Sequence, residues 1–231
     1  MNQAAEELRA TLAPWLAALG ADHLIVQIGA CIGGTPPHDE IDVVFHPLLE
    51  KGNPAVLVEP QGRELKRCVA TYRRKCPPEA FARLRFIEAA LAENDGSVHF
   101  TVRGRGSARA LSTLRMDRGF EWEKEKSYRV KELPCFTLRT LLTMAPPHVA
   151  WGWLQVDIEG HELIVLRQLS QQSSLPRLLT FEHLHLFPDE KVEALTVLSA
   201  LGYTEIGWHT DDAAYVLGTE SIPDRGSVRE S

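Results

Sequence analysis

The sequence predicts a single α/β domain whose core is a mostly parallel β-sheet flanked by helices. Three observations lead to this expectation. Continuous apolar and β-branched runs, typical of strands buried on both faces, recur along the 231 residues. Stretches that can hold a helix separate these runs. A glycine turn directly follows the first run, as it does where a parallel sheet meets a ligand.

The first element is an amphipathic helix beginning near Gln3. One apolar stripe defines it, formed by Leu8, Leu12, Trp15, Leu16 and Leu19. We therefore divide the chain into a helix packed on the domain (1–20), the main domain (21–218) and a tail (219–231). The tail lacks apolar periodicity, so we expect it to be disordered.

Strands and helices then alternate along the main domain. The predicted strands are HLIVQIGA after Gly20, AVLVEP (55–60), RLRFIEAAL (83–91), WGWLQVDI (151–158) and RLLTFEHLHL (177–186). The predicted helices occupy 62–76, 136–145, 160–172 and 189–201. The segment 97–133 begins and ends like a strand, and its Gly- and Arg-rich middle predicts a long loop, a candidate lid.

Composition limits the classes of partner. Lys plus Arg is 25 and Asp plus Glu is 31, a net charge of −6, so we expect a small-molecule substrate and neither nucleic acid nor a membrane. The basic residues on and after 62–76 are interpreted as a solvated helix face. The four cysteines form no CxxC pair, and the N-terminus lacks the pattern of a secretion signal. We expect a cytoplasmic protein with reduced thiols.

The glycine turn is the first candidate binding element. In IVQIGACIGG (25–34), Gly29 and Gly33 follow the first strand, where the backbone must turn sharply and approach a ligand. Glu59 ends the next strand, where an acid can accept hydrogen bonds from the two ribose hydroxyls of an adenosine. The structural alternative for Glu59 is a cap on the helix that starts near Gly62.

These motifs carry a family resemblance. VQIGACIGG, Asp42, LVEP, IEAALAENDGSVHF, TLRTLL, LQVDIEGHELIVL, TFEHLHL and LGY occur in the order seen in FkbM-type methyltransferases, which use S-adenosylmethionine. The resemblance covers roughly 23–218 and rests chiefly on LVEP and VDIEGHE. It implies a Rossmann-like class I methyltransferase fold with a mostly parallel, seven-stranded sheet.

The resemblance also implies positions for the cofactor. The expected cofactor-binding residues are Gln27, Gly29, Ala30, Cys31 and Gly33 at the methionine end, Glu59 and Pro60 at the ribose, Ala89 and Ala90 near the adenine, and Asp157. Three departures from the family pattern stand out. Gln27 replaces an acid found in many methyltransferases, Gln155 replaces a frequent lysine, and CIGGTPPHD replaces a turn that usually carries asparagine and aspartate.

The predicted catalytic residues are Asp157, Glu182 and His183. Ligands of a parallel sheet bind beyond the carboxyl ends of its strands, where Asp157 and Glu182 are expected side by side. Either His183 or His185 could accept a proton from a hydroxyl, whereas Glu162 is expected to be structural. The alternative for Asp157 is a buried acid that holds backbone amides. Carboxylate and imidazole can also hold a divalent ion, but we expect no metal.

The function favoured by the sequence is transfer of a methyl group from S-adenosylmethionine to a hydroxyl of a small molecule, such as a sugar or a natural-product intermediate. The sulfonium methyl is already a good electrophile, so positioning is most of the catalytic work. One alternative is a non-catalytic binding module of the same fold, suggested by Gln155 and the altered turn. Another is a nicotinamide-dependent oxidoreductase, although IGACIGG does not match GxGxxG.

Overall fold

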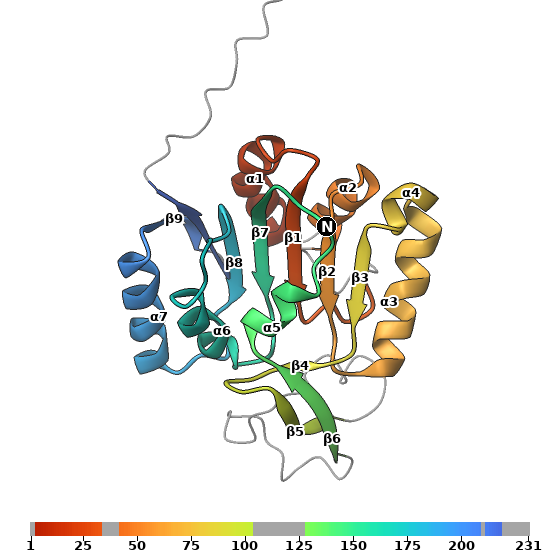
Figure 1. The fold of residues 1–231 in the computed structure, drawn as a ribbon. Coiled ribbons are helices and arrows are strands. Elements are labelled where there is room, and N and C mark those ends of the chain that lie inside the picture. Colours follow the sequence, from red (N-terminus) through yellow and green to blue (C-terminus); the bar gives the residue numbers. More distant parts are fainter. Residues whose placement is uncertain (1–2, 34–41, 104–127, 209–210, 219–231) are drawn as a thin grey trace, which may run out of the picture.

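The structure is a computed structural model that describes residues 3–33, 42–103, 128–208 and 211–218. Within these residues a seven-stranded sheet has the order β3-β2-β1-β7-β8-β10-β9 (Figure 1). The strands are β1 (His23–Ile28), β2 (Ala55–Val58), β3 (Leu84–Ile87), β7 (Ala150–Val156), β8 (Leu178–Glu182), β9 (Tyr203–Trp208) and β10 (Asp212–Leu217). The first five in this spatial order pair in parallel, and β10 is antiparallel to both of its neighbours. The predicted fold class is confirmed.

Helices cover both faces of this sheet (Figure 1). One core cluster joins the sheet to α1 (Gln3–Ala17), α2 (Asp42–Glu50), α3 (Gly62–Lys75) and α4 (Pro78–Phe81). The other joins it to α5 (Leu138–Thr143), α6 (Glu162–Leu169) and α7 (Pro188–Ala200). Successive strand residues alternate between the clusters, with Ile25 in the first and Val26 in the second. This double burial explains why the strands are continuous apolar runs.

A second, three-stranded sheet lies beyond the carboxyl ends of the parallel strands (Figure 1). It consists of β4 (Ala90–Leu91), β5 (Gly96–Arg103) and β6 (Tyr128–Phe136), in the order β4-β6-β5. The strand predicted over 83–91 is therefore two strands in different sheets, because the chain leaves the main sheet after Ile87. The middle of the candidate lid, 104–127, and the tail, 219–231, lie outside the described residues.

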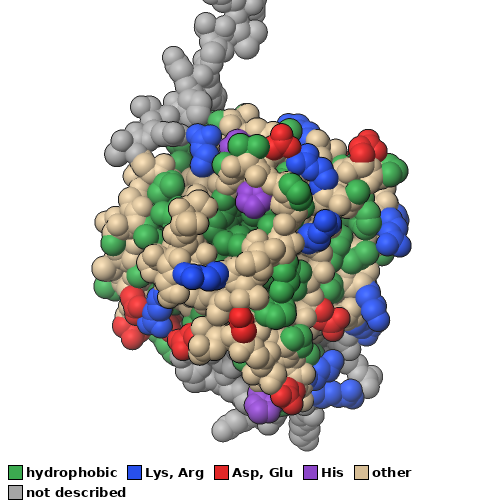
Figure 2. Space-filling model, in the orientation of Figure 1, with side chains coloured by type: hydrophobic (Ala, Val, Ile, Leu, Met, Phe, Trp, Pro, Cys, Tyr) green, Lys and Arg blue, Asp and Glu red, His purple; other side chains and the backbone are tan. Residues whose placement is uncertain are grey.

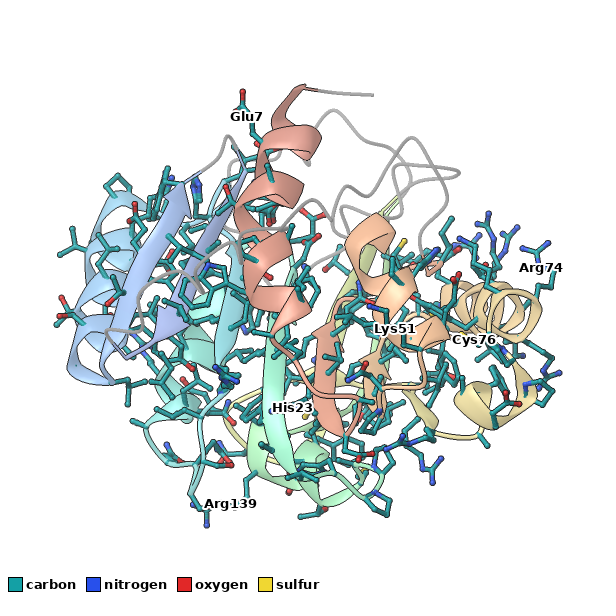
Figure 3. All side chains as sticks on the ribbon, turned by 90° about the horizontal axis from the view of Figure 1, so that it is seen from above. Glu7, His23, Lys51, Arg74, Cys76 and Arg139 are labelled. Carbon is teal, nitrogen blue, oxygen red and sulfur yellow. The ribbon has the colours of Figure 1, made fainter. Side chains whose placement is uncertain are left out.

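The basic residues of α3 lie on its solvent side. Arg63, Lys66, Arg67, Arg73, Arg74 and Lys75 are all exposed. Arg74 projects outward from the sheet in Figure 3. On the face drawn in Figure 2, basic and acidic side chains are interspersed, although basic ones are the more frequent along the edge formed by α3. In the described part of the chain, we find no helix with the length and apolar character needed to cross a bilayer.

Candidate functional site

The predicted site residues converge at the carboxyl edge of the main sheet. The turn after β1, Glu59 after β2 and Asp157 after β7 follow three neighbouring strands, and Glu182 ends the fourth. Backbone hydrogen bonds continue past the strand ends, since Asp157 N–H donates to Ile28 O over 2.9 Å. In Figure 1 the small sheet stands beside this edge.

The turn after β1 is fixed by backbone bonds to β2. The N–H groups of Gly29 and Ala30 both donate to Val58 O, each over 2.9 Å. Gly29 has φ +92°, and a Cβ atom there would lie 1.7 Å from Asp157 O. The requirement for glycine therefore comes from the close approach of β7. This contact gives a reason for glycine within the protein itself, and the expected approach of a ligand to Gly29 stays a prediction.

Gly33 ends the described part of this turn with φ +69°. A Cβ atom there would lie 2.9 Å from the Tyr72 ring and 3.0 Å from Cys68 Sγ, so glycine lets the turn pack against α3. Gly33 O also contacts His46 Nε2 at 3.2 Å. Burial, and then the neighbouring Lys75, lower the pKa of His46. The rest of the turn, 34–41, lies outside the described residues.

Glu59 joins the ends of β1 and β2. Its Oε2 accepts a hydrogen bond from Cys31 N–H over 2.9 Å, and its Oε1 accepts one from Gln61 N–H over 2.8 Å. The side chain is buried, which raises the pKa of Glu59 to about 7. The bond to Gln61 agrees with the capping alternative, because Gln61 is the N-cap residue of α3. The bond to Cys31 additionally ties the glycine turn to the same carboxylate.

The remaining predicted cofactor residues differ in exposure. Gln27 is buried within β1, and Pro60 is half-buried. Ala89 and Ala90 are both buried, and Ala90 pairs with Cys135 in the small sheet instead of ending the third strand. This differs from the expected position because the predicted strand is divided after Ile87.

Sequence reasoning did not single out Glu88. This exposed residue directly follows β3, as Glu59 follows β2. A Cβ atom at Gly62 would lie 2.2 Å from Glu88 Oε1, so this carboxylate rests against the first turn of α3. The signal was available, because an acid directly after a parallel strand is the same pattern that identified Glu59.

The segment after β7 carries a buried carboxylate. Glu162 is fully buried, and its Oε1 accepts hydrogen bonds from Ile158 N–H at 2.9 Å and Gly160 N–H at 3.1 Å. Burial raises the pKa of Glu162 to about 7. These bonds support the structural role expected for Glu162. Glu159, in the same turn, has φ +57°, an uncommon conformation for a residue with a side chain.

His185, which follows the end of β8, lies beside two of the acids. His185 Nε2 lies 3.2 Å from Glu159 Oε2 and 3.9 Å from Glu182 Oε1. His183 instead stacks on Trp208, with ring centroids 4.1 Å apart. Continued strand alternation would place both histidines on the face opposite Glu182. The strand ends at Glu182 and the chain turns, with Leu186 N–H donating to His183 O, so alternation does not continue.

Glu182 and Asp157 meet across the ends of β7 and β8. One carboxylate oxygen each of Asp157, Glu162 and Glu182 lies within 4.8 Å of the other two. Burial, and then the negative charge of Glu159 and Glu162, raise the pKa of Glu182 well above its ordinary value. The arrangement offers proton acceptors and ligands for a cation at the place where a parallel sheet binds its substrates.

Comparisons with known proteins identify the family of the chain and agree with its fold. Residues 27–205 match the family described as the methyltransferase FkbM domain. No match is found among curated proteins. Of the solved structures, methyltransferase FkbM from Methylobacillus flagellatus KT has a TM-score of 0.54 and 15% identity, covering 94% of this chain and 55% of that one. The chain thus spans little more than half the length of that protein.

Two further structures have lower scores. Monomeric WbdD has a TM-score of 0.48 and 13% identity, over 94% of this chain and 41% of that one. The methyltransferase domain of bacterial CtHen1-C has a TM-score of 0.46 and 11% identity, over 94% of this chain and 97% of that one.

Proposed function

The chain belongs to the FkbM methyltransferase family, and from this premise we propose that it transfers a methyl group from S-adenosylmethionine to a hydroxyl of a small-molecule acceptor. The observation that carries the proposal is the position of Glu59. It places a buried carboxylate at the end of β2, bonded to the turn after β1. A carboxylate at this position of a parallel sheet suits the two ribose hydroxyls of an adenosine.

The residues around Glu59 fit the rest of this cofactor. The tight turn at Gly29, Ala30, Cys31 and Gly33 would hold the methionine end, with Gln27 beneath it. Pro60 would lie beside the ribose, and Ala89 and Ala90 near the adenine. Glu88 adds a polar group at the end of β3. When bound, the cofactor supplies an electrophilic methyl group on a sulfonium sulfur.

The acceptor side of the site is formed by the ends of β7 and β8. Asp157, half-buried beside Glu182, is the proposed base that takes the proton from the acceptor hydroxyl. Glu182 and His185 would orient the acceptor oxygen toward the methyl group, because most of the rate gain comes from positioning. We choose His185 over the predicted His183 for this task because His185 lies against Glu159 and Glu182.

The proposal includes the cellular compartment and the class of acceptor. We place it in the cytoplasm, in agreement with four cysteines that are free thiols in the structure. The acceptor is proposed to be small, such as a sugar or a natural-product intermediate, because the net charge of −6 disfavours a nucleic acid or an anionic membrane.

Calorimetry and an acceptor screen test the function in sequence. Purified protein is titrated with S-adenosylmethionine, with its demethylated product and with NAD. We expect saturable binding of the first two and none of NAD; binding of NAD alone would exclude the proposal. Hydroxylated small molecules are then screened for release of the demethylated cofactor, with the O-methyl form of each active compound as a blocked control.

A further inference from the structure

The ends of β7 and β8 hold more ionisable groups than a single proton transfer requires. One donor atom each of Glu159, Glu182 and His185 lies within 4.8 Å of the other two, as is also the case for Asp157, Glu162 and Glu182. Glu182 belongs to both groups, so two adjacent clusters of possible ligands share one residue. They come from only two segments, the turn after β7 and the end of β8.

These groups are withdrawn from water. Glu162 is fully buried, Glu159 is 9% exposed, and the side chain of Glu182 is 14% exposed. Within the part of the chain that the structure describes, no lysine or arginine forms an ion pair with Glu162 or Glu182. A concentration of buried carboxylates is costly unless a cation or hydrogen-bond donors compensate it.

A second observation points to a ligand in this cluster. The hydrogen bonds that the Glu162 carboxylate accepts from Ile158 and Gly160 both go to Oε1. Its Oε2 is buried and has no hydrogen-bond partner among the described residues, and Oε2 of Glu182 is in the same position. Buried polar atoms almost always have a partner, so two such oxygens in one cluster need an explanation. A bound cation supplies it.

We propose that Glu159, Glu182 and His185 bind a divalent cation, and that Glu182 links this site to the neighbouring carboxylates of Asp157 and Glu162. Imidazole together with carboxylate suits a first-row transition ion such as Mn²⁺ better than Mg²⁺, which prefers oxygen ligands alone. The turn at Glu159 contributes by directing its carboxylate toward His185 at 3.2 Å.

This proposal rests on the proposed methyl transfer and narrows its substrate class. A cation at this point binds the acceptor oxygen and makes its hydroxyl more acidic. The O–H proton passes to Asp157, the oxygen forms its bond to the methyl carbon, and the carbon–sulfur bond breaks with its electrons remaining on sulfur. The acceptor class is then a molecule with two adjacent oxygens, such as a vicinal diol or a hydroxy acid.

Mn²⁺ binding tests the site without any acceptor. Chelator-treated protein is titrated with Mn²⁺, and free Mn²⁺ is measured by electron paramagnetic resonance. We expect one saturable site whose affinity falls at least tenfold in Glu182→Gln and in His185→Gln. The matched controls are Glu64→Gln, another buried acid, and His148→Gln, an exposed histidine; both should bind like the wild type.

Two outcomes would overturn the site: no saturable Mn²⁺ binding by the wild type, or equal binding by both cluster variants. Thermal melting checks the fold of each variant, and Glu182→Gln should fold well because it removes a buried charge. Calorimetric binding of S-adenosylmethionine to the same samples separates the two proposals. If the wild type binds S-adenosylmethionine but not Mn²⁺, only the proposed cation site is rejected. If it binds Mn²⁺ but not S-adenosylmethionine, the proposed methyl transfer is rejected.

Discussion

The N–H group of Cys31 donates a hydrogen bond to Oε2 of Glu59 over 2.9 Å, so one buried carboxylate holds the turn after β1 against the end of β2. The other oxygen of the same carboxylate accepts a bond from the N-cap residue of α3. Three elements of the proposed cofactor site therefore depend on one side chain. Changes at Glu59 should affect both the cofactor and the fold, and the two effects can be measured separately.

Glu59→Gln should weaken S-adenosylmethionine binding at least tenfold, which is about 1.4 kcal/mol. The side chain keeps its size, but the ribose hydroxyls lose a charged acceptor, and the amide group cannot accept from both Cys31 and Gln61. Calorimetry measures the affinity, with Glu79→Gln, an exposed acid of α4, as the control. Wild-type affinity in a folded Glu59→Gln protein would contradict the ribose assignment.

The pH dependence of stability should also change at Glu59. Burial raises the pKa of Glu59 to about 7, above the value of 4.5 expected in the unfolded chain. The native state then holds this proton more tightly, so the contribution to stability is full below pH 4.5 and is lost as the pH rises through about 7. Between pH 5 and pH 8 the free energy of unfolding, measured with urea, should fall by about 3 kcal/mol more in the wild type than in Glu59→Gln. An equal fall in the free energy of unfolding of the two proteins would contradict the raised pKa of Glu59.

Asp157→Asn should separate catalysis from folding. The backbone of Asp157 already pairs with Ile28, and its side chain is half-buried, so the neutral variant should melt near the wild-type temperature. Methyl transfer should fall by a factor of roughly 10² or more, because the proposed proton acceptor loses its charge. The paired measurement is thermal melting beside turnover per folded molecule. A destabilised variant with full activity would show that Asp157 is structural.

The two histidines after β8 should behave differently. His185→Gln should lower methyl transfer at least tenfold with little change in melting temperature, because this ring lies against Glu159 and Glu182. His183→Ala removes the stacking on Trp208 and should cost about 1 kcal/mol of stability. Turnover and denaturant unfolding of both variants make the comparison. If His183→Ala alone lost activity while keeping its stability, the assignment would be reversed.

Gly29→Ala should damage the fold severely. The added Cβ atom would lie 1.7 Å from Asp157 O, so β1 and β7 would have to separate at the site, and we expect a loss of more than about 3 kcal/mol. Gly202→Ala is the matched control, because Gly202 has φ +84° and no atom within 4 Å of the added Cβ. It should cost only about 1 kcal/mol in backbone strain. Equal stability of the two variants would contradict the close contact.

Much of the fold was predictable from the sequence, because strands buried on both faces leave continuous apolar runs. The strands β1, β2, β7 and β8 and the helices α3, α5, α6 and α7 match predicted segments, with β7 and α7 each beginning one residue earlier than predicted. The strand β9 left no such signal, since most of its residues are exposed or half-buried. The division of the third predicted run between β3 and β4 was also hidden, because Ala89 and Ala90 are as apolar as a continuing strand would be.

The sequence predicted the site residues that lie at the ends of strands, but not the contacts that form beyond those ends. An acid at the end of a parallel strand, or directly after it, identified Glu59, Asp157 and Glu182, and each lies at the carboxyl edge. The choice between His183 and His185 depended on a turn whose direction no periodicity reveals. The contact of Gly29 with Asp157 joins residues far apart in the chain, so its reason for being glycine required the three-dimensional fold.

The position of β10 matters while the chain is being synthesised and folds. This late strand fills the space between β8 and β9. Before β10 pairs with it, β8 has no hydrogen-bonded partner on one side and presents open backbone groups along that edge. Such an edge can recruit another nascent chain. Pairing of β10 with β8 therefore removes one edge at which the folding polypeptide can aggregate.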